Sequence, residues 1–477
     1  MPRRLALVGL AALLAACGTT VPQAGRGPAR QVAGGDGLTA PQTRASSPSS
    51  SLSSAPGGRT PGSVSGGALP TSSPVSAGNA QVTTTAPGKV TTAPVKVGFV
   101  VASNSTDAAF KAAGVGALQV GDQMAQARAV IDDLNAHGGL AGRRIQPFFH
   151  TPDSSSSSYE EADQVTCAAF TQDGHVAFVI STVAHTQVLH ACLAKAHIPL
   201  LDDGLGLYDT KVVVPGLLFM PSGWLLDRLM RDEIDALARM GFLSDPGKVG
   251  VLLYDIPTSQ RVLHDTVLPR LAHYGKTQVD VAASPFTTEG ASNQQANVLK
   301  FRNDGVTRVI QIAFSPIGFM VAAESQAYHP RYALDSNVGP DTIRQTVPAA
   351  QLNGMVGVGW VPSSDTGSAT PVTAAGRRCL ALMRKTGQDT TNSTTASLME
   401  EFCDAGWFLQ AATDAAHDAT AQGLLGGARL THGFASASSF AADMTTGRPD
   451  GLSGYRDIAY SGGCSCIQYV GPVRTAA

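Results

Sequence analysis

The chain of 477 residues is 43% hydrophobic and 15% charged, which provides enough apolar sequence for two ordinary domains with their own cores. Its formal net charge at pH 7 is −2, so the charge balance gives no sign of the basic surface that nucleic-acid binding requires. Nucleic acid is therefore not expected as a partner.

The first 17 residues have the pattern of an export signal. Arg3 and Arg4 precede an apolar run from Leu5 to Leu14, which is shorter than the about 20 residues that a membrane-spanning helix needs. The sequence Leu14-Ala15-Ala16-Cys17 resembles a bacterial lipobox. This resemblance implies acylation of Cys17 and a protein held by lipid at the extracytoplasmic face of the cell membrane. The alternative is an ordinary secretory signal with an incidental cysteine.

Residues 18–94 are rich in Gly, Pro, Ser, Thr and Ala and contain no Phe, Trp or Tyr. Such a segment cannot bury enough apolar surface to offset the entropy lost on ordering. We expect a disordered tether between the membrane and the folded part, and the sequence leaves open whether its hydroxyl groups carry sugars.

Strands and helices alternate from residue 95 onward. Strands are predicted at 95–101, in a run that ends at Pro152-Asp153, at 176–180 and at 198–201, with a helix between each strand and the next. The first of these helices presents Met124, Ala127, Ile131 and Leu134 on one face. Alternation of this kind is typical of βαβ units with a parallel sheet.

The alternation restarts after a predicted helix at 224–240. Strands are predicted at 249–254, 279–283, 306–314, 332–334 and 355–361, with helices at 259–274, 291–303 and 317–328 between them. Beyond residue 362 the pattern becomes helical, at 374–386, 397–421 and 436–444, and a final hairpin is predicted from 455–459 and 467–470. This second alternation predicts a second lobe.

Four cysteines lie on predicted helices, and an even number in an exported chain favours disulfides. Cys167 and Cys192 lie on successive helices of right-handed crossovers, which should pack side by side on one face of the sheet. Cys379 and Cys403 also lie on successive helices. We therefore predict the pairs 167–192 and 379–403.

The remaining two cysteines, Cys464 and Cys466, flank a single serine. A disulfide between them would be strained or labile, and a Cys-x-Cys metal or redox site is the alternative. The sequence does not decide between these two states.

A set of short motifs, in order and at consistent spacing, carries a resemblance to a known family. The chain resembles the type I periplasmic-binding fold, in the branch that includes branched-chain amino-acid binding proteins. The residues that match are Ile131 to Asn135, Gly138-Gly139, Gly142-Arg143, Asp153, Ile180-Ser181 and Ile198-Pro199.

The resemblance implies an α/β protein of two doubly wound parallel-sheet lobes joined by a hinge of three crossovers. The first lobe would comprise residues 95–222 and 362–445, and the second 223–361 and 446–477. A hinge of three crossovers suits closure of the two lobes around a ligand.

In a doubly wound sheet, ligands bind beyond the carboxyl ends of the strands, so the residues that follow the strands are candidates for ligand binding. These are Thr182, His185, Thr186, Asp202, Asp203, Tyr254, Phe314, Ser315, Asp335 and Asn337.

The chemistry of these candidates differs between neighbouring loops. The resemblance implies that hydroxyls and helix N–H groups hold a ligand carboxylate, and Thr182, His185 and Thr186 keep part of that pattern. The adjacent carboxylates of Asp202 and Asp203 disfavour an anion there and favour a cation or a polyol. The alternative is that one Asp caps a turn and the other faces solvent. A turn role is also the simpler interpretation of Asp335 and Asn337.

No arrangement in the sequence indicates catalysis. His185, His190 and His197 lack the spacing of a metal-binding pair on a helix and are interpreted as solvated helix residues. Glu400-Glu401 is interpreted as a solvated face. There is no nucleophile elbow and no phosphate-binding loop, so we expect neither an enzyme nor a cofactor.

We therefore predict a lipid-anchored, monomeric solute-binding protein that captures a small polar ligand, such as an amino acid or an amide. The resemblance implies that its partner is the permease of an ABC importer. The alternative is a sensor of the same fold that signals through a separate membrane partner. A third possibility, an enzyme on this scaffold, lacks a catalytic constellation.

Overall fold

A computed structural model describes residues 93–103, 105–112, 115–153, 158–203, 207–286, 294–367 and 373–477. The predicted signal, Cys17 and nearly all of the predicted tether lie outside these residues. The predictions made for them remain predictions.

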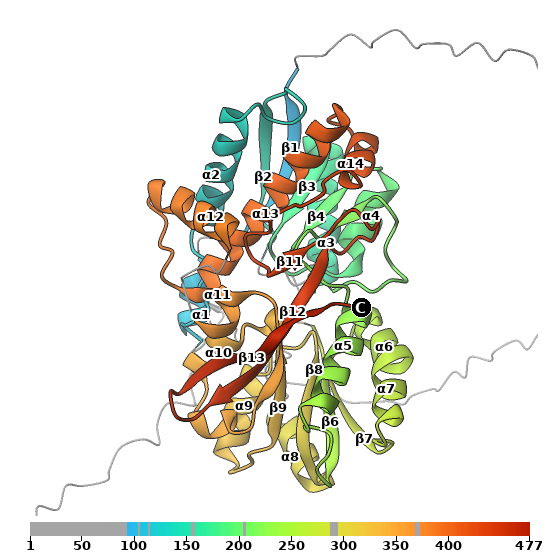
Figure 1. Cartoon of the computed structure of the whole chain (residues 1–477), viewed down its shortest axis with the longest axis vertical. Coiled ribbons are helices and arrows are strands. Elements are labelled where there is room, and N and C mark those ends of the chain that lie inside the picture. Colours follow the sequence, from blue (N-terminus) through green and yellow to red (C-terminus); the bar gives the residue numbers. More distant parts are fainter. Residues whose placement is uncertain are drawn as a thin grey trace, which may run out of the picture. The chain divides into compact units, whose positions relative to one another are not determined.

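The first sheet has five parallel strands in the order β2-β1-β3-β4-β5 (Figure 1). Its central strands are almost completely buried, as expected for a sheet that is covered on both faces. The strands are β1 (Val95–Val100), β2 (Ile145–His150), β3 (Phe178–Ser181), β4 (Leu200–Asp202) and β5 (Leu218–Phe219).

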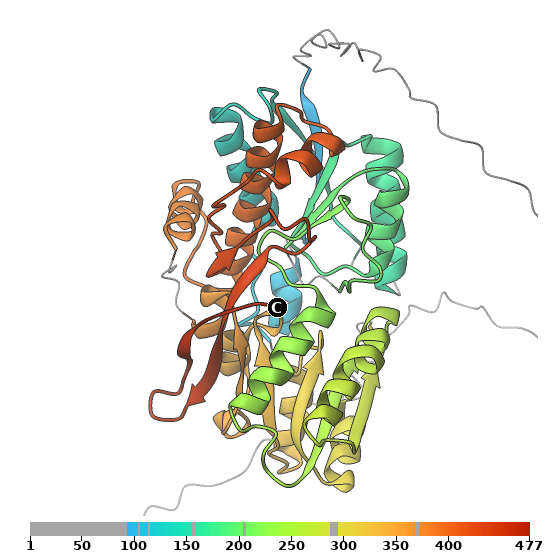
Figure 2. The same ribbon diagram turned by 45° about the vertical axis from the view of Figure 1, so that its right-hand side comes forward.

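Helices pack on both faces of this sheet, and we call the sheet with its helices the first lobe. One core contains residues of α2, α12, α13 and α14, and a separate core contains residues of α3 and α4, on the opposite side in Figures 1 and 2. The helices are α1 (Thr106–Ala112), α2 (Gln123–Ala136), α3 (Tyr159–Ala168), α4 (Gln187–Lys195), α12 (Ala374–Lys385), α13 (Ser393–Ala416) and α14 (Ala421–Ala428).

The second sheet, the centre of the second lobe, has eight strands, ordered β11-β12-β10-β9-β8-β6-β7 with β13 beside β12. Strands β6 to β10 are parallel, and β11 to β13 are antiparallel, so the predicted final hairpin is confirmed. The strands are β6 (Lys248–Tyr254), β7 (Val279–Ser284), β8 (Val306–Ile312), β9 (Arg331–Asp335), β10 (Val356–Gly359), β11 (Ala441–Ala442), β12 (Leu452–Ser461) and β13 (Cys466–Thr475).

Two further apolar cores cover the two faces of the second sheet, which confirms the predicted doubly wound α/β class. The predicted helix at 259–274 consists of α6, a π-helical segment at Leu263–Val267, and α7. The helices are α5 (Leu226–Arg239), α6 (Pro257–Val262), α7 (Leu268–His273), α8 (Gln294–Asp304), α9 (Ile317–Ser325), α10 (Pro340–Thr346) and α11 (Pro362–Thr366).

The chain passes between the lobes three times: between β5 and α5, between β10 and α12, and between α14 and β12. The first and third crossings lie side by side, since the backbone N–H of Met220 donates to Pro449 (2.7 Å) and that of Gly451 donates to Met220 (2.8 Å). Strand β11 pairs within the second sheet, although the sequence analysis assigns residues up to 445 to the first lobe. The exact lobe boundaries therefore remain a prediction.

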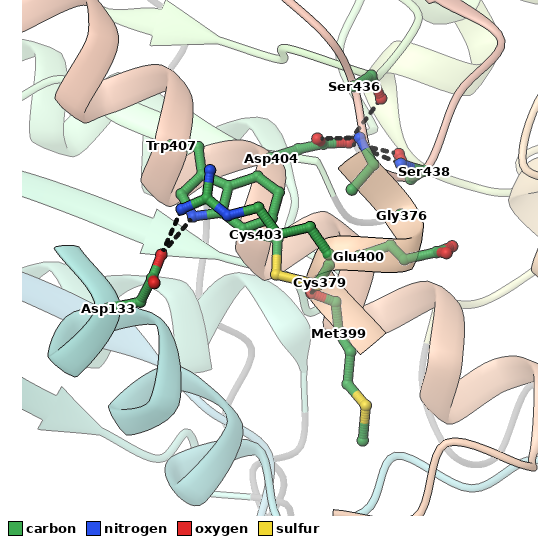
Figure 3. Close-up of a disulfide and its surroundings, with 12 residues drawn as sticks. Asp133, Gly376, Cys379, Met399, Glu400, Cys403, Asp404, Trp407, Ser436 and Ser438 are labelled. Atoms are coloured by element: carbon green, nitrogen blue, oxygen red, sulfur yellow. Dashed lines mark hydrogen bonds and ion pairs between the residues drawn. A yellow bond between two sulfur atoms is a disulfide. The ribbon is translucent and has the colours of Figure 1, made fainter. Parts of the chain in front are cut away.

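The structure contains three disulfides. Cys167–Cys192 joins α3 to α4, and Cys379–Cys403 (Figure 3) joins α12 to α13, so both predicted pairs are confirmed. Cys464 pairs with Cys466 in the turn between β12 and β13, which resolves the alternative that the sequence left open.

The predicted helix at 436–444 is wrong. The side chain of Asp404 accepts hydrogen bonds from the backbone N–H groups of Ala437 (2.5 Å) and Ser438 (3.0 Å) and from the hydroxyl of Ser436 (2.7 Å). These contacts bind the segment to α13 in an irregular conformation before it enters β11. A buried carboxylate from another helix thus overrides the local helical pattern.

Candidate functional site

The carboxyl ends of β3 and β4 lie side by side, because Ser181 and Asp202 are partners in the parallel register. Thr182, the next residue after β3, is buried, and its hydroxyl lies 3.5 Å from Nε2 of Gln123 on α2. The structure therefore brings Thr182, Asp202 and Asp203 to one edge of the first sheet, as predicted from the strand pattern.

Beside this edge, the amino end of α4 already holds a carboxylate of the protein itself. Asp163 of α3 accepts hydrogen bonds from the backbone N–H (2.8 Å) and the hydroxyl (2.7 Å) of Thr186, and from Nδ1 of His185 (2.8 Å). Thr186 in turn caps the helix by accepting from the N–H of Val188. These polar groups at the start of α4 are satisfied internally.

The interpretation of His185 and His190 as solvated residues is wrong, because both side chains are buried. The second ring nitrogen of His185 lies 2.8 Å from Oγ of Ser181. Nε2 of His190 accepts from the backbone N–H of Val214 at 3.0 Å, and burial lowers the pKa of His190 to about 4, so this ring is neutral at pH 7. Both residues occupy the interior because polar partners are available there.

Asp202 and Asp203 are both buried, so neither faces solvent. The hydroxyl of Tyr208 donates to Asp202 (2.8 Å), and the N–H groups of Ser222 (2.9 Å) and Gly223 (3.1 Å) donate to Oδ1 of Asp203. Asp203 therefore fastens the first crossing to the first sheet. Burial, and next the charge of Asp404, raise the pKa of Asp203 well above its ordinary value.

In the second lobe, the ends of β6, β7 and β8 carry a cluster of aromatic rings. The ring of Tyr254 lies 4.6 Å from that of Phe286 and 4.8 Å from that of Phe314, and Ser315 beside it is exposed. Tyr159 of α3 in the first lobe stacks on Phe286 at 4.0 Å. This aromatic cluster therefore contains a ring from each lobe.

The end of β9 forms the turn that the sequence favours for Asp335 and Asn337. The carboxylate of Asp335 accepts from the backbone N–H of Asn337 at 2.8 Å and caps a short 3₁₀ helix, Ser336–Val338. Asp335 is buried, which raises its pKa to about 6, whereas Asn337 is half-buried.

Polar side chains link the two lobes near these strand ends. Arg261 of α6 donates to Asp209 of the first lobe (2.8 Å) and to Gln187 at the start of α4 (3.0 Å). The hydroxyl of Thr258 also donates to Gln187 (3.3 Å). Lys211 and Asp265 add an exposed ion pair between the lobes. These contacts require the lobes to be close together.

The sequence analysis missed a group of acidic residues on α13. Glu400 is 1% exposed and accepts a hydrogen bond from the hydroxyl of Ser363 at 2.7 Å, so the interpretation of Glu400-Glu401 as a solvated face is wrong. Figure 3 shows Glu400 and Asp404 on this helix, with Asp404 directed toward Ser436 and Ser438. Burial raises the pKa of Glu400 to about 8 and that of Glu401 well above its ordinary value.

The apolar residues next to these acids are the feature of the sequence from which their burial could have been predicted. Phe402, Cys403 and Trp407 lie around the same turns of α13, and nearly all faces of the helix are buried. A helix that is apolar on all sides lies in a core, so polar residues within it are buried as well.

Within the described ranges, no group of three or more His, Cys, Asp or Glu side chains is arranged to hold a metal ion. None of the helices described is both long and apolar enough to cross a bilayer.

Two sheets with facing strand ends, three chain crossings and polar contacts between the lobes define a two-lobed ligand-binding protein. The model of a family described as periplasmic binding protein matches residues 94–454. The chain therefore belongs to the periplasmic binding protein family, a family of extracytoplasmic ligand-binding proteins, and the predicted type I periplasmic-binding fold is confirmed. No curated protein matches the chain.

Solved structures share this fold at low sequence identity. An extracellular ligand-binding receptor from Verminephrobacter eiseniae is 16% identical, with a TM-score of 0.58 over 79% of this chain and 100% of that one. A branched-chain amino-acid ABC transporter protein from Thermus thermophilus with bound valine is 14% identical, with a TM-score of 0.59 over 81% and 98%. A fatty-acid ABC transporter substrate-binding protein from Thermomonospora curvata is 12% identical, with a TM-score of 0.58 over 81% and 93%.

Proposed function

We propose that this protein captures a small polar ligand, such as an amino acid or an amide, between its lobes and delivers it to the permease of an ABC importer. The observation that carries the proposal is the bridge from Arg261 to Asp209 and Gln187, which joins the lobes beside the ends of their strands. A ligand held there is enclosed when the lobes close and released when they part. The Thermus protein with bound valine, which shares the fold, is consistent with this role.

Five of the ten candidate residues are proposed as direct contacts with such a ligand: Ser315 is exposed, Tyr254 and Asn337 are partly exposed, and Thr182 and Phe314 are buried at the strand ends and would be uncovered when the lobes part. We propose that the hydroxyl of Thr182, the rings of Tyr254 and Phe314, and the polar groups of Ser315 and Asn337 contact it directly. An apolar part of the ligand would pack on the rings, and its polar groups would bond to the hydroxyls and the amide. The other five would position the strand ends through their internal hydrogen bonds: His185, Thr186, Asp202, Asp203 and Asp335.

The location of the protein is part of the proposal. Acylation of Cys17 would hold a monomeric, non-enzymatic binding protein at the extracytoplasmic face of the membrane, and residues 18–94 would act as its tether. Metabolic labelling with a palmitate analogue tests this: wild-type protein should carry the label, and C17S should not. Label on C17S would refute the anchor.

A thermal-shift screen of the mature chain against amino acids, amides, polyamines, sugars and short peptides tests the binding role. A ligand at 100 times its Kd should stabilise the protein by about 2.7 kcal/mol. Thr182→Val should lower the affinity for a ligand found in the screen about tenfold, because one buried hydrogen bond is lost. Thr413→Val is the matched control, because its hydroxyl bonds only within α13 and is equally buried. Equal weakening by both variants, or no ligand in the set, would contradict the proposal.

Uptake of the same labelled ligand by cells distinguishes import from sensing. A strain that lacks the protein should lose uptake, and the wild-type gene should restore it. Unchanged uptake would refute the importer role and favour a sensor that signals through another membrane partner.

A further inference from the structure

A cavity of about 150 Å³ lies beside the first and third crossings and is lined in part by β5. None of the ten candidate residues lines it. Its walls are mostly apolar and come from the segment at 210–216, β5, the start of α5, α14 and the residue after it, and the third crossing. The main apolar contributors are Leu218, Phe219, Leu225, Leu425, Met444 and Pro449.

The size and the walls of this cavity suit an organic guest. Apolar cavities of about 150 Å³ accept molecules the size of benzene. Val214 and Leu430, which neighbour lining residues, are 40% and 56% exposed, so the surface around the cavity is also apolar. An apolar tail or ring would therefore leave water for a preformed pocket.

Two arginines also line the cavity, Arg429 of the segment after α14 and Arg448 of the third crossing. The guanidinium of Arg429 is exposed and makes no hydrogen bond or ion pair with the residues that the structure describes, whereas the backbone N–H of Arg429 donates to Gly427. Nε of Arg448 lies 3.7 Å from Asp450, whose other oxygen is already bound by the guanidinium of Arg228.

The nearby carboxylates make their contacts with groups other than the guanidinium of Arg429. Asp227 accepts hydrogen bonds from the backbone N–H and the hydroxyl of Thr210, a lining residue. Asp443 accepts from Thr445, and Asp450 is shared between Arg228 and Arg448. The guanidinium of Arg429 therefore remains available to an incoming anion.

We propose that this cavity, the crossing pocket, is a second binding site, for a small carboxylate with an apolar tail. The tail would fill the apolar walls, and the carboxylate would bond to Arg429 beside Arg448. Because the walls come from both crossings, movement of the lobes changes the shape of the pocket. Occupancy of the pocket and of the cleft between the lobes should then be linked.

Calorimetric titration of the whole mature chain with hexanoate, hexan-1-ol and hexylamine tests the site. Hexanoate should bind about tenfold more tightly than the alcohol, because only the acid pairs with a guanidinium, and the amine should bind most weakly. Equal affinity for the three probes, or no binding of hexanoate at millimolar concentration, would overturn the proposal.

Two variants locate the bound probe. Arg429→Gln should weaken hexanoate about tenfold but leave hexan-1-ol unchanged. Leu425→Trp should fill the pocket and abolish binding of both, whereas Leu299→Trp, at an exposed position on α8, should not. If Leu425→Trp fails to fold, the Arg429→Gln variant, whose side chain is exposed, still tests whether hexanoate binds in the crossing pocket. Hexanoate binding that neither variant changes would refute this site.

The link between the two sites is tested once a cleft ligand is known, and this step alone depends on the proposed function. Saturating hexanoate should change the Kd of the cleft ligand about fivefold or more, and the cleft ligand should change the Kd of hexanoate by the same factor. Unchanged affinities would refute the coupling between the two sites. Whether the crossing pocket binds hexanoate at all is tested separately by the titrations above.

Discussion

The carboxylate of Glu400 on α13 accepts a 2.7 Å hydrogen bond from the hydroxyl of Ser363 on α11, and both residues are buried. Two residues further along α11, Asp365 accepts from Ser336 (3.0 Å) and from Tyr469 (2.5 Å), so α11 is attached to the second lobe. The Glu400–Ser363 bond therefore connects the lobes next to the second crossing. The other oxygen of Glu400 is buried and has no hydrogen-bond partner in the described part of the chain.

Glu400→Gln should remove part of the pH dependence of stability. Burial raises the pKa of Glu400 from 4.5 to about 8, so the folded protein favours the protonated acid. Its contribution to stability is complete below pH 4.5 and is lost as the pH rises toward 8. At pH 7, about 2.5 pH units above the ordinary pKa, the free energy of unfolding is lower by about 3 kcal/mol, because each unit corresponds to about 1.36 kcal/mol.

Urea denaturation at pH 5 and pH 8 measures this effect. Gln keeps an acceptor for Ser363 and cannot ionise, so the variant should match wild type near pH 5 and exceed it near pH 8. Glu160→Gln, at an exposed position on α3, should follow wild type at both values. If Glu400→Gln also follows wild type at both values, the buried acid does not have a raised pKa.

Arg261→Ala should favour an open form of the protein, in which the two lobes are further apart. The substitution removes the contacts with Asp209 and Gln187 that link the lobes. Because Arg261 is partly exposed, we expect a cost to closure of about 1 kcal/mol, or roughly fivefold weaker ligand binding. Small-angle scattering should show a larger radius of gyration for the variant.

Arg270→Ala is the matched control for that experiment. The exposed fraction of Arg270 is similar to that of Arg261, and Arg270 makes an ion pair with Asp235, but both of these residues belong to the second lobe. Its loss should leave the radius of gyration and ligand affinity unchanged. Identical scattering curves for Arg261→Ala and Arg270→Ala would show that the Arg261 bridge does not hold the lobes together.

Much of the fold could be predicted because it depends on local pattern. The apolar run from residue 95 became β1, and the spacing of Ala127, Ile131 and Leu134 became a buried face of α2, with Met124 partly buried against the same core. The pair 167–192 followed from the rule that successive crossover helices lie side by side, and the pair 379–403 from the position of its cysteines on successive helices. The helix predicted at 436–444 was wrong because its backbone bonds to Asp404, which is distant in sequence.

The candidate site could be predicted only in position. The strand-end rule brought Thr182, Asp202 and Asp203 to one edge, but it does not say which polar groups already have partners. Asp163 occupies the start of α4 and Asp203 holds the first crossing, and both contacts depend on tertiary structure. The apolar neighbours of Glu400 indicate a buried helix, but its hydrogen-bond partner Ser363 on α11 is distant in sequence, and no pattern near Glu400 identifies it.

The three disulfides should differ in their contribution to stability. Cys379 and Cys403 are 24 residues apart, so their bond closes a long loop, and replacing both by Ala should cost about 2–4 kcal/mol. Cys464 and Cys466 are two residues apart at an exposed turn, so replacing both by Ser should cost less than about 1 kcal/mol. Urea denaturation compares the two variants, and equal losses would contradict the loop-length argument.

Asp163→Asn should destabilise the first lobe although the side chain keeps its shape. The carboxylate of Asp163 accepts three hydrogen bonds, two from Thr186 and one from His185. An amide places a donor where one oxygen accepted, so at least one buried donor loses its partner, at a cost of about 1–3 kcal/mol. Asp173→Asn, at an exposed position, is the control. A melting temperature unchanged from wild type in Asp163→Asn would mean that the start of α4 does not need its internal anion, and would reopen it as a place for a ligand carboxylate.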